Sequence, residues 1–138
     1  MVSQATKPEK TRIYIFLLAV AADRVTKYLA LSGALGELYF NRGVSFSLLD
    51  GYASVGLATA LSGLALLLFA CVKSAALRAA PGLPLLWAGA LSNLADRLVY
   101  GYVIDWVRVI FFINLADLWL CLGGILLIKH CFARAQGK

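Results

Sequence analysis

The tetrapeptide Asn-Leu-Ala-Asp occurs twice in this chain, at residues 93–96 and 114–117, and each copy lies in an apolar stretch. A charged side chain in the hydrocarbon of a bilayer costs about 3 kcal/mol or more, so such residues are usually retained for a function. Each Asp follows an Asn by three positions, which on a helix places the two side chains on one face. The repeat therefore predicts two carboxylates, Asp96 and Asp117, with hydrogen-bonding partners in Asn93 and Asn114.

Two carboxylates close together in a low-dielectric site cannot both ionise easily, so one retains a proton while the other stays charged. The ionised partner can take a proton from water that attacks a peptide carbonyl, and the protonated partner can donate to the developing oxyanion. This is the chemistry of an aspartic protease. We expect Asp96 and Asp117 to be its catalytic pair.

Two other interpretations use the same residues. Intramembrane Asp residues can pair with cations to hold helices together, and Arg24, Lys27 and Arg97 are available partners. Carboxylates also line proton or ion pathways, which makes a small transporter the alternative function. The acids cluster toward one side, however, and no polar residues continue through a charge-free second apolar segment.

Composition indicates a membrane protein, because 62% of the residues are hydrophobic and only 14% are charged. The chain has room for a single integral-membrane domain, residues 1–138, with four spans of about 20 residues each. The predicted fold is therefore all-α. We expect the four transmembrane helices at about 13–35, 51–72, 79–99 and 109–128, with the first retained as a helix rather than removed as a signal.

The basic residues predict how the spans are oriented. They lie before the first predicted span, between the second and third, and after the fourth, and an even number of spans places all three groups on one side. The positive-inside rule makes that side, and both termini, cytoplasmic. The net charge of +6 is then explained by contacts with membrane phospholipid, and we expect no nucleic-acid partner. The spacing of the cysteines and of His130 predicts neither a metal site nor a cofactor.

The other two connections should face outward. Residues 32–49 contain aromatic and β-branched residues around an Asn-Arg-Gly turn, which predicts a small β-like segment at the outer surface. We expect Asn41 and Gly43 in this segment to help hold a substrate, since extended strands offer backbone groups to a peptide. Residues 100–112, with Asp105 and Trp106, should form an interfacial segment. Asp96 and Asp117 lie at similar distances from Trp106, which predicts matched depth near the outer leaflet.

Five motifs in order closely resemble the bacterial lipoprotein signal peptidase family, also called signal peptidase II. The motifs are Asp23-Arg24-Val25-Thr26-Lys27, the segment from Asn41 to Ser47, the segment from Gly89 to Arg97, Val103-Ile104-Asp105-Trp106, and the second Asn-Leu-Ala-Asp. The chain departs from the usual pattern at Ser92, Ile113 and Val44-Ser45. Those departures bear on substrate range more than on the chemistry.

The resemblance implies a four-span aspartic protease of the bacterial inner membrane. Such enzymes remove the signal peptide of a prolipoprotein just before a cysteine that carries a diacylglyceryl group. By motif match Asp96 and Asp117 would be catalytic, and Asn93, Arg97 and Asn114 would support them. Asp23, Lys27 and Asn41 would belong to the wider pocket, although Asp23 and Lys27, one helical turn apart, could equally form a local ion pair. We expect a monomer whose partner is a lipid-modified prolipoprotein.

Overall fold

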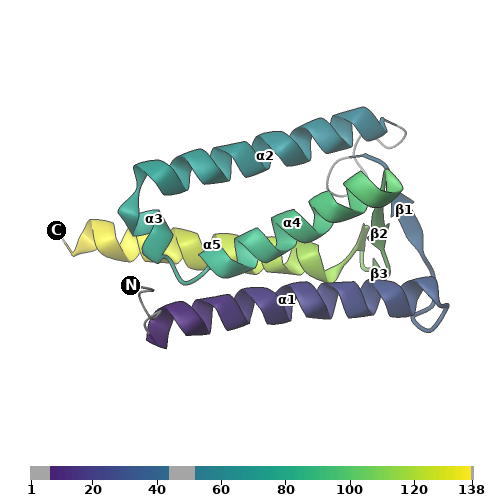
Figure 1. Cartoon of the computed structure of the whole chain (residues 1–138), viewed down its shortest axis with the longest axis horizontal. Helices are drawn as coiled ribbons and strands as arrows, with labels where there is room; N and C mark the ends of the chain where they lie inside the picture. The colour runs from purple at the N-terminus through teal and green to yellow at the C-terminus, as the bar shows by residue number, and fades with distance from the viewer. Residues whose placement is uncertain (1–6, 44–51, 138) are drawn as a thin grey trace, which may run out of the picture.

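The computed structural model describes residues 7–43 and 52–137. Their backbone forms four long helices, α1 (Lys7–Leu31), α2 (Ala53–Lys73), α4 (Leu83–Tyr100) and α5 (Leu115–Gln136), and one short helix, α3 (Ala75–Ala79). The long helices run side by side, and α1 begins at the end of the molecule where α5 ends (Figure 1). The opposite end holds the short strands β1 (Tyr39–Asn41), β2 (Val103–Asp105), β3 (Val107–Arg108) and β4 (Phe112–Ile113).

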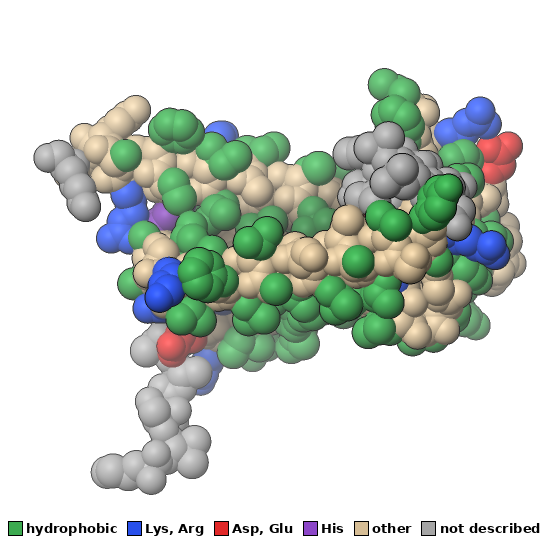
Figure 2. All heavy atoms as spheres, turned by 90° about the horizontal axis from the view of Figure 1, so that it is seen from above, with side chains coloured by type: hydrophobic (Ala, Val, Ile, Leu, Met, Phe, Trp, Pro, Cys, Tyr) green, Lys and Arg blue, Asp and Glu red, His purple; other side chains and the backbone are tan. Residues whose placement is uncertain are grey.

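Hydrophobic side chains face outward, and polar side chains fill much of the interior. Leu66 and Val72 of α2 are 68% and 73% exposed, whereas Asp23 and Asp96 are 0% exposed. Figure 2 shows hydrophobic side chains over the middle of one face, with Lys and Arg toward its two ends. Among the described helices, α2 and α5 are long and apolar enough to cross a bilayer by length and composition. This distribution is that of a helical membrane protein, as the composition predicted.

The helix ends differ from the predicted spans in ways that local sequence explains. The first predicted span was expected to continue to residue 35, but α1 ends at Leu31, and Gly33 and Gly36 that follow have positive φ angles. The third was expected from residue 79, where α3 ends instead, and α4 begins at Leu83 with a proline in its first turn.

The fourth predicted span was expected from residue 109, and this start was wrong. Residues 107–108 and 112–113 pair as strands, and α5 begins only at Leu115. Asn114 caps α5, because its side chain accepts from the Asp117 backbone N–H while the Asp117 side chain accepts from the Asn114 N–H. An apolar run by itself does not distinguish a strand from a helix, whereas this capping box fixes where the helix starts.

The segment after α1 and the segment after α4 meet in one small sheet. β1 pairs antiparallel with β2, so that Tyr39 lies opposite Asp105 and Asn41 opposite Val103. β1 is part of the segment in which strands were expected, while residues 44–49 of that segment lie outside the described residues. The expected interfacial segment at 100–112 forms β2, β3 and the start of β4. The sheet therefore holds Asn41 and Asp105 at the same end of the helices.

Small residues let α4 and α5 approach closely. A Cβ added at Gly89 would collide with the Ala116 carbonyl oxygen, and one added at Gly82 would collide with that of Gly123. α4 also contacts α1 and α2, so it is the central helix of the bundle. This close approach brings Asn93 of α4 next to Asp117 of α5.

Candidate active site

Asp96 lies in a buried ionic cluster between α1 and α4. Its Oδ1 is 2.6 Å from Arg24 Nη1, and its Oδ2 is 2.6 Å from Lys27 Nζ. The backbone N–H of Ile104 also donates to Asp96 Oδ2 at 3.4 Å. Both carboxylate oxygens are therefore engaged in charge-assisted contacts with cations.

Asp23 belongs to the same cluster. Its Oδ2 lies 3.0 Å from Lys27 Nζ, so the expected local pair on α1 is present. The same oxygen is 2.9 Å from Arg24 Nη2, and Asp23 Oδ1 accepts a 2.9 Å hydrogen bond from the Ala116 backbone N–H. Ala116 lies in the first turn of α5, where backbone N–H groups lack helical partners. Asp23 therefore ties α1 to the start of α5.

Asp117 is held by neutral donors. The Asn93 side-chain amide donates to its Oδ1 at 2.8 Å, and the Asn114 backbone N–H donates to its Oδ2 at 3.2 Å. Lys27 Nζ in turn donates to Asn93 Oδ1 at 3.1 Å. Asn93 thus connects the ionic cluster to Asp117, and both Asn residues of the repeated tetrapeptide contact this carboxylate.

Asp105 is a second carboxylate close to Asp117. The Asn114 side-chain amide donates to its Oδ1 at 2.5 Å, and the Asn41 amide donates to its Oδ2 at 3.2 Å. No ion pair is formed by Asp105 within the described chain. Burial, followed by the charge of the neighbouring Asp117, raises the pKa of Asp105 to about 7. Asp105 is therefore an acid that can keep its proton near neutral pH.

Asn114 links the two acids directly. Its side-chain amide donates to Asp105, while its side-chain oxygen accepts a 3.0 Å hydrogen bond from the Asp117 N–H. The sequence reasoning assigned Asp105 only to an interfacial segment and so missed this arrangement. The available signal was an ionisable residue in the apolar motif Val103-Ile104-Asp105-Trp106, which has no second copy to mark it.

Arg97 connects the helices to the segment after β1. Its Nη2 donates to the Gly43 carbonyl oxygen at 3.0 Å, and the Gly43 N–H donates to Asn41 Oδ1 at 3.0 Å. Gly56 of α2 approaches the same segment, since a Cβ there would lie 2.5 Å from the Gly43 oxygen. The structure therefore brings Asn41, Gly43 and Arg97 together, as expected for residues that surround one site.

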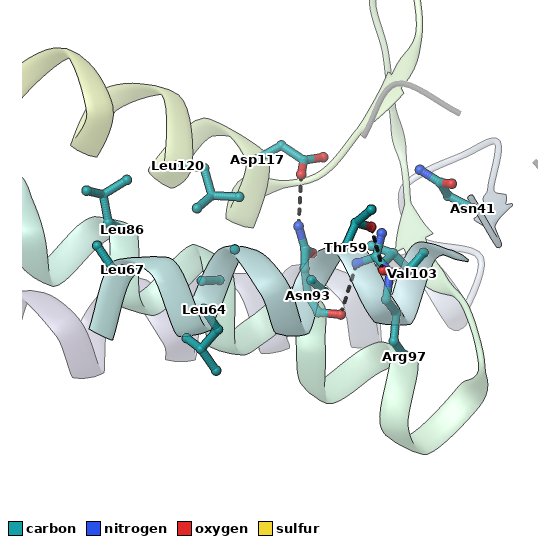
Figure 3. A pocket seen from close by; sticks show the side chains of 14 residues that line it. Asn41, Thr59, Leu64, Leu67, Leu86, Asn93, Arg97, Val103, Asp117 and Leu120 are labelled. Carbon is teal, nitrogen blue, oxygen red and sulfur yellow. Dashed lines mark hydrogen bonds between the residues drawn. The ribbon is translucent and has the colours of Figure 1, made fainter. Parts of the chain in front are cut away.

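A cavity of about 390 Å³ joins these polar residues to an apolar channel. Asn41, Asn93, Arg97 and Asp117 line its polar end. Figure 3 shows Asp117 and Asn93 hydrogen-bonded at this end, and the leucines of the wall lie along the cavity away from them: Leu64, Leu67, Leu86 and Leu120. Neither Asp96 nor Asp105 lines the cavity, but Asn41, which donates to Asp105, does. An apolar cavity that ends in one carboxylate, two amides and a guanidinium can hold a ligand with an apolar body and a polar reactive group.

No group of three or more metal-ligating side chains occurs in the part of the chain that the structure describes. The described site instead offers two carboxylates, amide donors and one guanidinium. These groups can exchange protons and orient a peptide carbonyl.

Comparison with known proteins identifies a set of similar chains. A family model described as "Signal peptidase (SPase) II" matches residues 15–133. The lipoprotein signal peptidase of Syntrophomonas wolfei is 36% identical over 129 residues, covering 82% of this chain and 87% of that protein. The one from Chlamydia trachomatis serovar D is 35% identical over 108 residues, covering 72% of this chain and 65% of that protein. A solved bacterial membrane enzyme superposes with a TM-score of 0.77 at 26% identity, covering 94% of this chain and 92% of its own.

Proposed function

We propose that this chain, which belongs to the signal peptidase II family, is an aspartic endopeptidase that removes signal peptides from lipid-modified prolipoproteins. Cleavage would occur just before the lipidated cysteine. The observation that carries the proposal is the link through Asn114 between Asp105 and Asp117, at the polar end of an apolar cavity. A lipid-modified substrate needs both features, because its apolar part must be housed while its peptide bond meets the acids.

We assign the catalytic pair to Asp105 and Asp117, in place of the expected Asp96 and Asp117. Both oxygens of Asp96 are engaged in ion pairs, one with Arg24 and one with Lys27, which leaves neither oxygen open to a substrate or to Asp117. Asp105 contacts neutral amides, is buried, and has the partner Asn114 in common with Asp117. Asp96, with Asp23 and Lys27, would instead position Asn93, which orients the Asp117 carboxylate.

In the proposed reaction, Asp117 is ionised and takes a proton from water as the water oxygen attacks the scissile carbonyl. Asp105 is protonated and donates to the developing oxyanion, which yields a tetrahedral diol. Collapse of the diol breaks the C–N bond, and a proton passes from the acids to the leaving amine. Asn93 and Asn114 keep the Asp117 carboxylate in place throughout. Substrate contact with Asn41 would open the path from the cavity to Asp105.

The membrane arrangement is also part of the proposal. We take α1, α2, α4 and α5 as four spans, with both termini in the cytoplasm and the acids near the outer leaflet. The support is that α1 begins and α5 ends at one end of the bundle, opposite the strands. We also expect a monomer in contact with bilayer phospholipid. A cysteine near Ala79 should then be labelled from the cytoplasm and one near Gly43 from outside; labelling of both from the same side would overturn the four-span arrangement.

The transport alternative lacks support from the cavity. Apart from the polar end, the lining consists of leucine, alanine, valine and glycine residues and one threonine, Thr59. The facing α2 carries no charge before its last residue, Lys73. An ion would find one hydroxyl and no charged group along that part of the described cavity.

The decisive experiment compares cleavage of a purified diacylglyceryl-modified prolipoprotein with that of the same polypeptide lacking the lipid. The proposal expects cleavage of the lipidated form before its modified cysteine and little turnover of the other. Asp105→Asn should remove the cleavage. Proton or ion flux in reconstituted vesicles without any cleavage would favour the transporter instead.

A further inference from the structure

The end of the molecule opposite the strands carries two further cavities, which the proteolytic site does not use. One, of about 550 Å³, lies among α1, α2, α3 and α4 and is lined by Arg12, Arg78, Leu83 and Trp87 among others. We call it the terminal cavity. The other, of about 320 Å³, is an apolar groove between α1 and α4 and shares Arg12, Leu83 and Trp87 with the first. The two cavities therefore adjoin at these three residues, and one is basic while the other is apolar.

Both arginines of the terminal cavity are positioned by backbone carbonyl groups. Arg12 Nη2 donates to the Ala80 oxygen at 3.1 Å. Arg78 Nη1 donates to the Cys71 oxygen at 2.6 Å and to the Val72 oxygen at 3.1 Å, at the end of α2. A guanidinium has five N–H donors, so each arginine keeps donors for another acceptor.

The terminal cavity has an excess of positive charge. Within the described chain, neither Arg12 nor Arg78 forms an ion pair with a carboxylate. Glu9 also lines the cavity and offsets one of the two positive charges, which leaves a net charge of +1. A positive cavity between membrane helices attracts an anionic headgroup, because the surrounding medium screens charge poorly.

The apolar groove has the direction and length that an acyl chain needs. Ile13 and Phe16 of α1 and Pro84 and Leu91 of α4 line it. α1 and α4 both begin at this end of the molecule, so the groove leads from the arginines toward the middle of the bundle. From Leu83 to Leu91 the helix rises about 12 Å. That distance lies within one leaflet, whose hydrocarbon is about 15 Å thick. Trp87, half-buried, lies where a headgroup would meet its acyl chain.

From these contacts we propose that the terminal cavity and its groove bind one anionic glycerophospholipid of the surrounding bilayer. The phosphate contacts Arg12 and Arg78, and one acyl chain lies between α1 and α4. The bound lipid joins α1, α3 and α4 at the end of the bundle where the site residues supply no contacts. Its role is separate from the proteolytic site, and the inference holds whether or not the chain is a protease.

The test measures lipid retained by the purified full-length protein in detergent, by native mass spectrometry and by the thermal midpoint of unfolding. Dioleoyl phosphatidylglycerol should be retained at one molecule per chain, at least tenfold more tightly than dioleoyl phosphatidylcholine, and should raise the midpoint. Arg12→Gln combined with Arg78→Gln should lower the phosphatidylglycerol affinity at least tenfold. Arg134→Gln, at an exposed arginine near the end of α5 outside both cavities, should leave it unchanged.

Two further arms separate this site from its alternatives. Leu91→Trp fills the groove without changing charge and should also weaken phosphatidylglycerol binding, which keeps the test available if the double variant does not fold. Inorganic phosphate at millimolar concentration should not compete; competition would reveal a free-anion site rather than a lipid site. The proposal would be wrong if the two lipids were retained equally, or if Arg134→Gln lowered the phosphatidylglycerol affinity as much as the double variant does. Arg12 and Arg78 would then only cap helix ends on a generally basic surface.

Discussion

Lys27 Nζ lies 2.6 Å from Asp96 Oδ2, and both side chains are almost fully buried, at 2% and 0% exposed. Arg24 reaches the other oxygen of the same carboxylate. Both oxygens of Asp96 are therefore engaged in ion pairs. The two Asp residues of the repeated tetrapeptide therefore have different environments, because Asp117 accepts hydrogen bonds from an amide and a backbone N–H instead.

Asp96→Asn should therefore destabilise the protein, because the buried Lys27 and the partly exposed Arg24 are then balanced by Asp23 alone, which leaves one positive charge of the cluster uncompensated. Breaking a buried pair in this way typically costs about 3–5 kcal/mol. Thermal unfolding in detergent measures the effect. Glu37→Gln is the matched control, since Glu37 pairs with Arg108 at 3.1 Å with both side chains about 70% exposed. Such a surface pair contributes at most about 1 kcal/mol. An Asp96→Asn protein as stable as wild type but inactive would return Asp96 to the catalytic pair.

Asp105→Asn and Asp117→Asn should each abolish turnover while the protein stays folded. Asn keeps the shape of the side chain but can neither carry nor accept the shared proton, and the loss of a catalytic acid or base costs roughly 10²- to 10⁴-fold or more. Turnover is measured by following the cleavage of the prolipoprotein with the lipidated cysteine on a gel. Unchanged thermal midpoints would assign the loss to chemistry. A variant of either position that kept most of its activity would exclude that residue from the pair.

Turnover should fall as the pH rises through about 7, because the proton on Asp105 is needed and burial raises its pKa to about 7. The same proton affects stability. Between the unfolded pKa of 3.8 and the folded value of about 7, the folded state binds more protons, so its stability decreases as the pH rises and is constant above that range. Asp105→Asn should remove this slope, which thermal midpoints at pH 5 and pH 8 would measure. A parallel decrease in Asp105→Asn would assign the slope to another group.

The sequence predicted that the protein is a membrane protein and that Asp117 belongs to its site. The reason is that an ionisable residue in an apolar stretch costs free energy and is usually retained for a function. The sequence also predicted that Asn93 and Asn114 would accompany the acids. Asp105 could not be distinguished in the same way, since its environment depends on Asn41 and Asn114, which are 64 and 9 positions away. The ionic partners of Asp96 were among the alternatives considered, but only the packing of α1 against α4 selects them.

The end of a helix can be predicted from the sequence where a capping motif marks it. It cannot be predicted from hydropathy where the apolar stretch continues beyond the helix. Asn114 and Asp117 form a capping box that can be read from the sequence, but the predicted start of the fourth span at residue 109 was based on hydropathy alone. The pairing of β1 with β2 joins segments more than 60 positions apart, and hydropathy carries no information about such long-range pairing.

Gly56→Ala should lower turnover, because its Cβ would lie 2.5 Å from the Gly43 oxygen that accepts from Arg97. Backbone cannot move aside as a flexible side chain can, so the segment after β1 must shift at the edge of the cavity. Gly124→Ala is the matched control, on α5 outside the cavity, where an added Cβ meets nothing within 4 Å. Cleavage rates of the two variants make the comparison. Equal rates would mean that the segment after β1 does not contribute to the site.

Asn41→Ala should reduce turnover of the lipidated substrate by about tenfold or more, as expected for losing contacts worth roughly 1–2 kcal/mol. Asn41 donates to Asp105 and accepts from the Gly43 N–H, so one side chain connects the acid to the segment that borders the cavity. Its bond to the Asp105 carboxylate also opposes the upward shift of the Asp105 pKa. In the variant the fall in turnover should therefore occur at a higher pH than in wild type. Ser32→Ala, in the same connection, removes only an exposed bond to the Leu29 carbonyl and should leave both quantities unchanged. Wild-type turnover with an unmoved pH profile in Asn41→Ala would make the residue part of a plain connection rather than of the site.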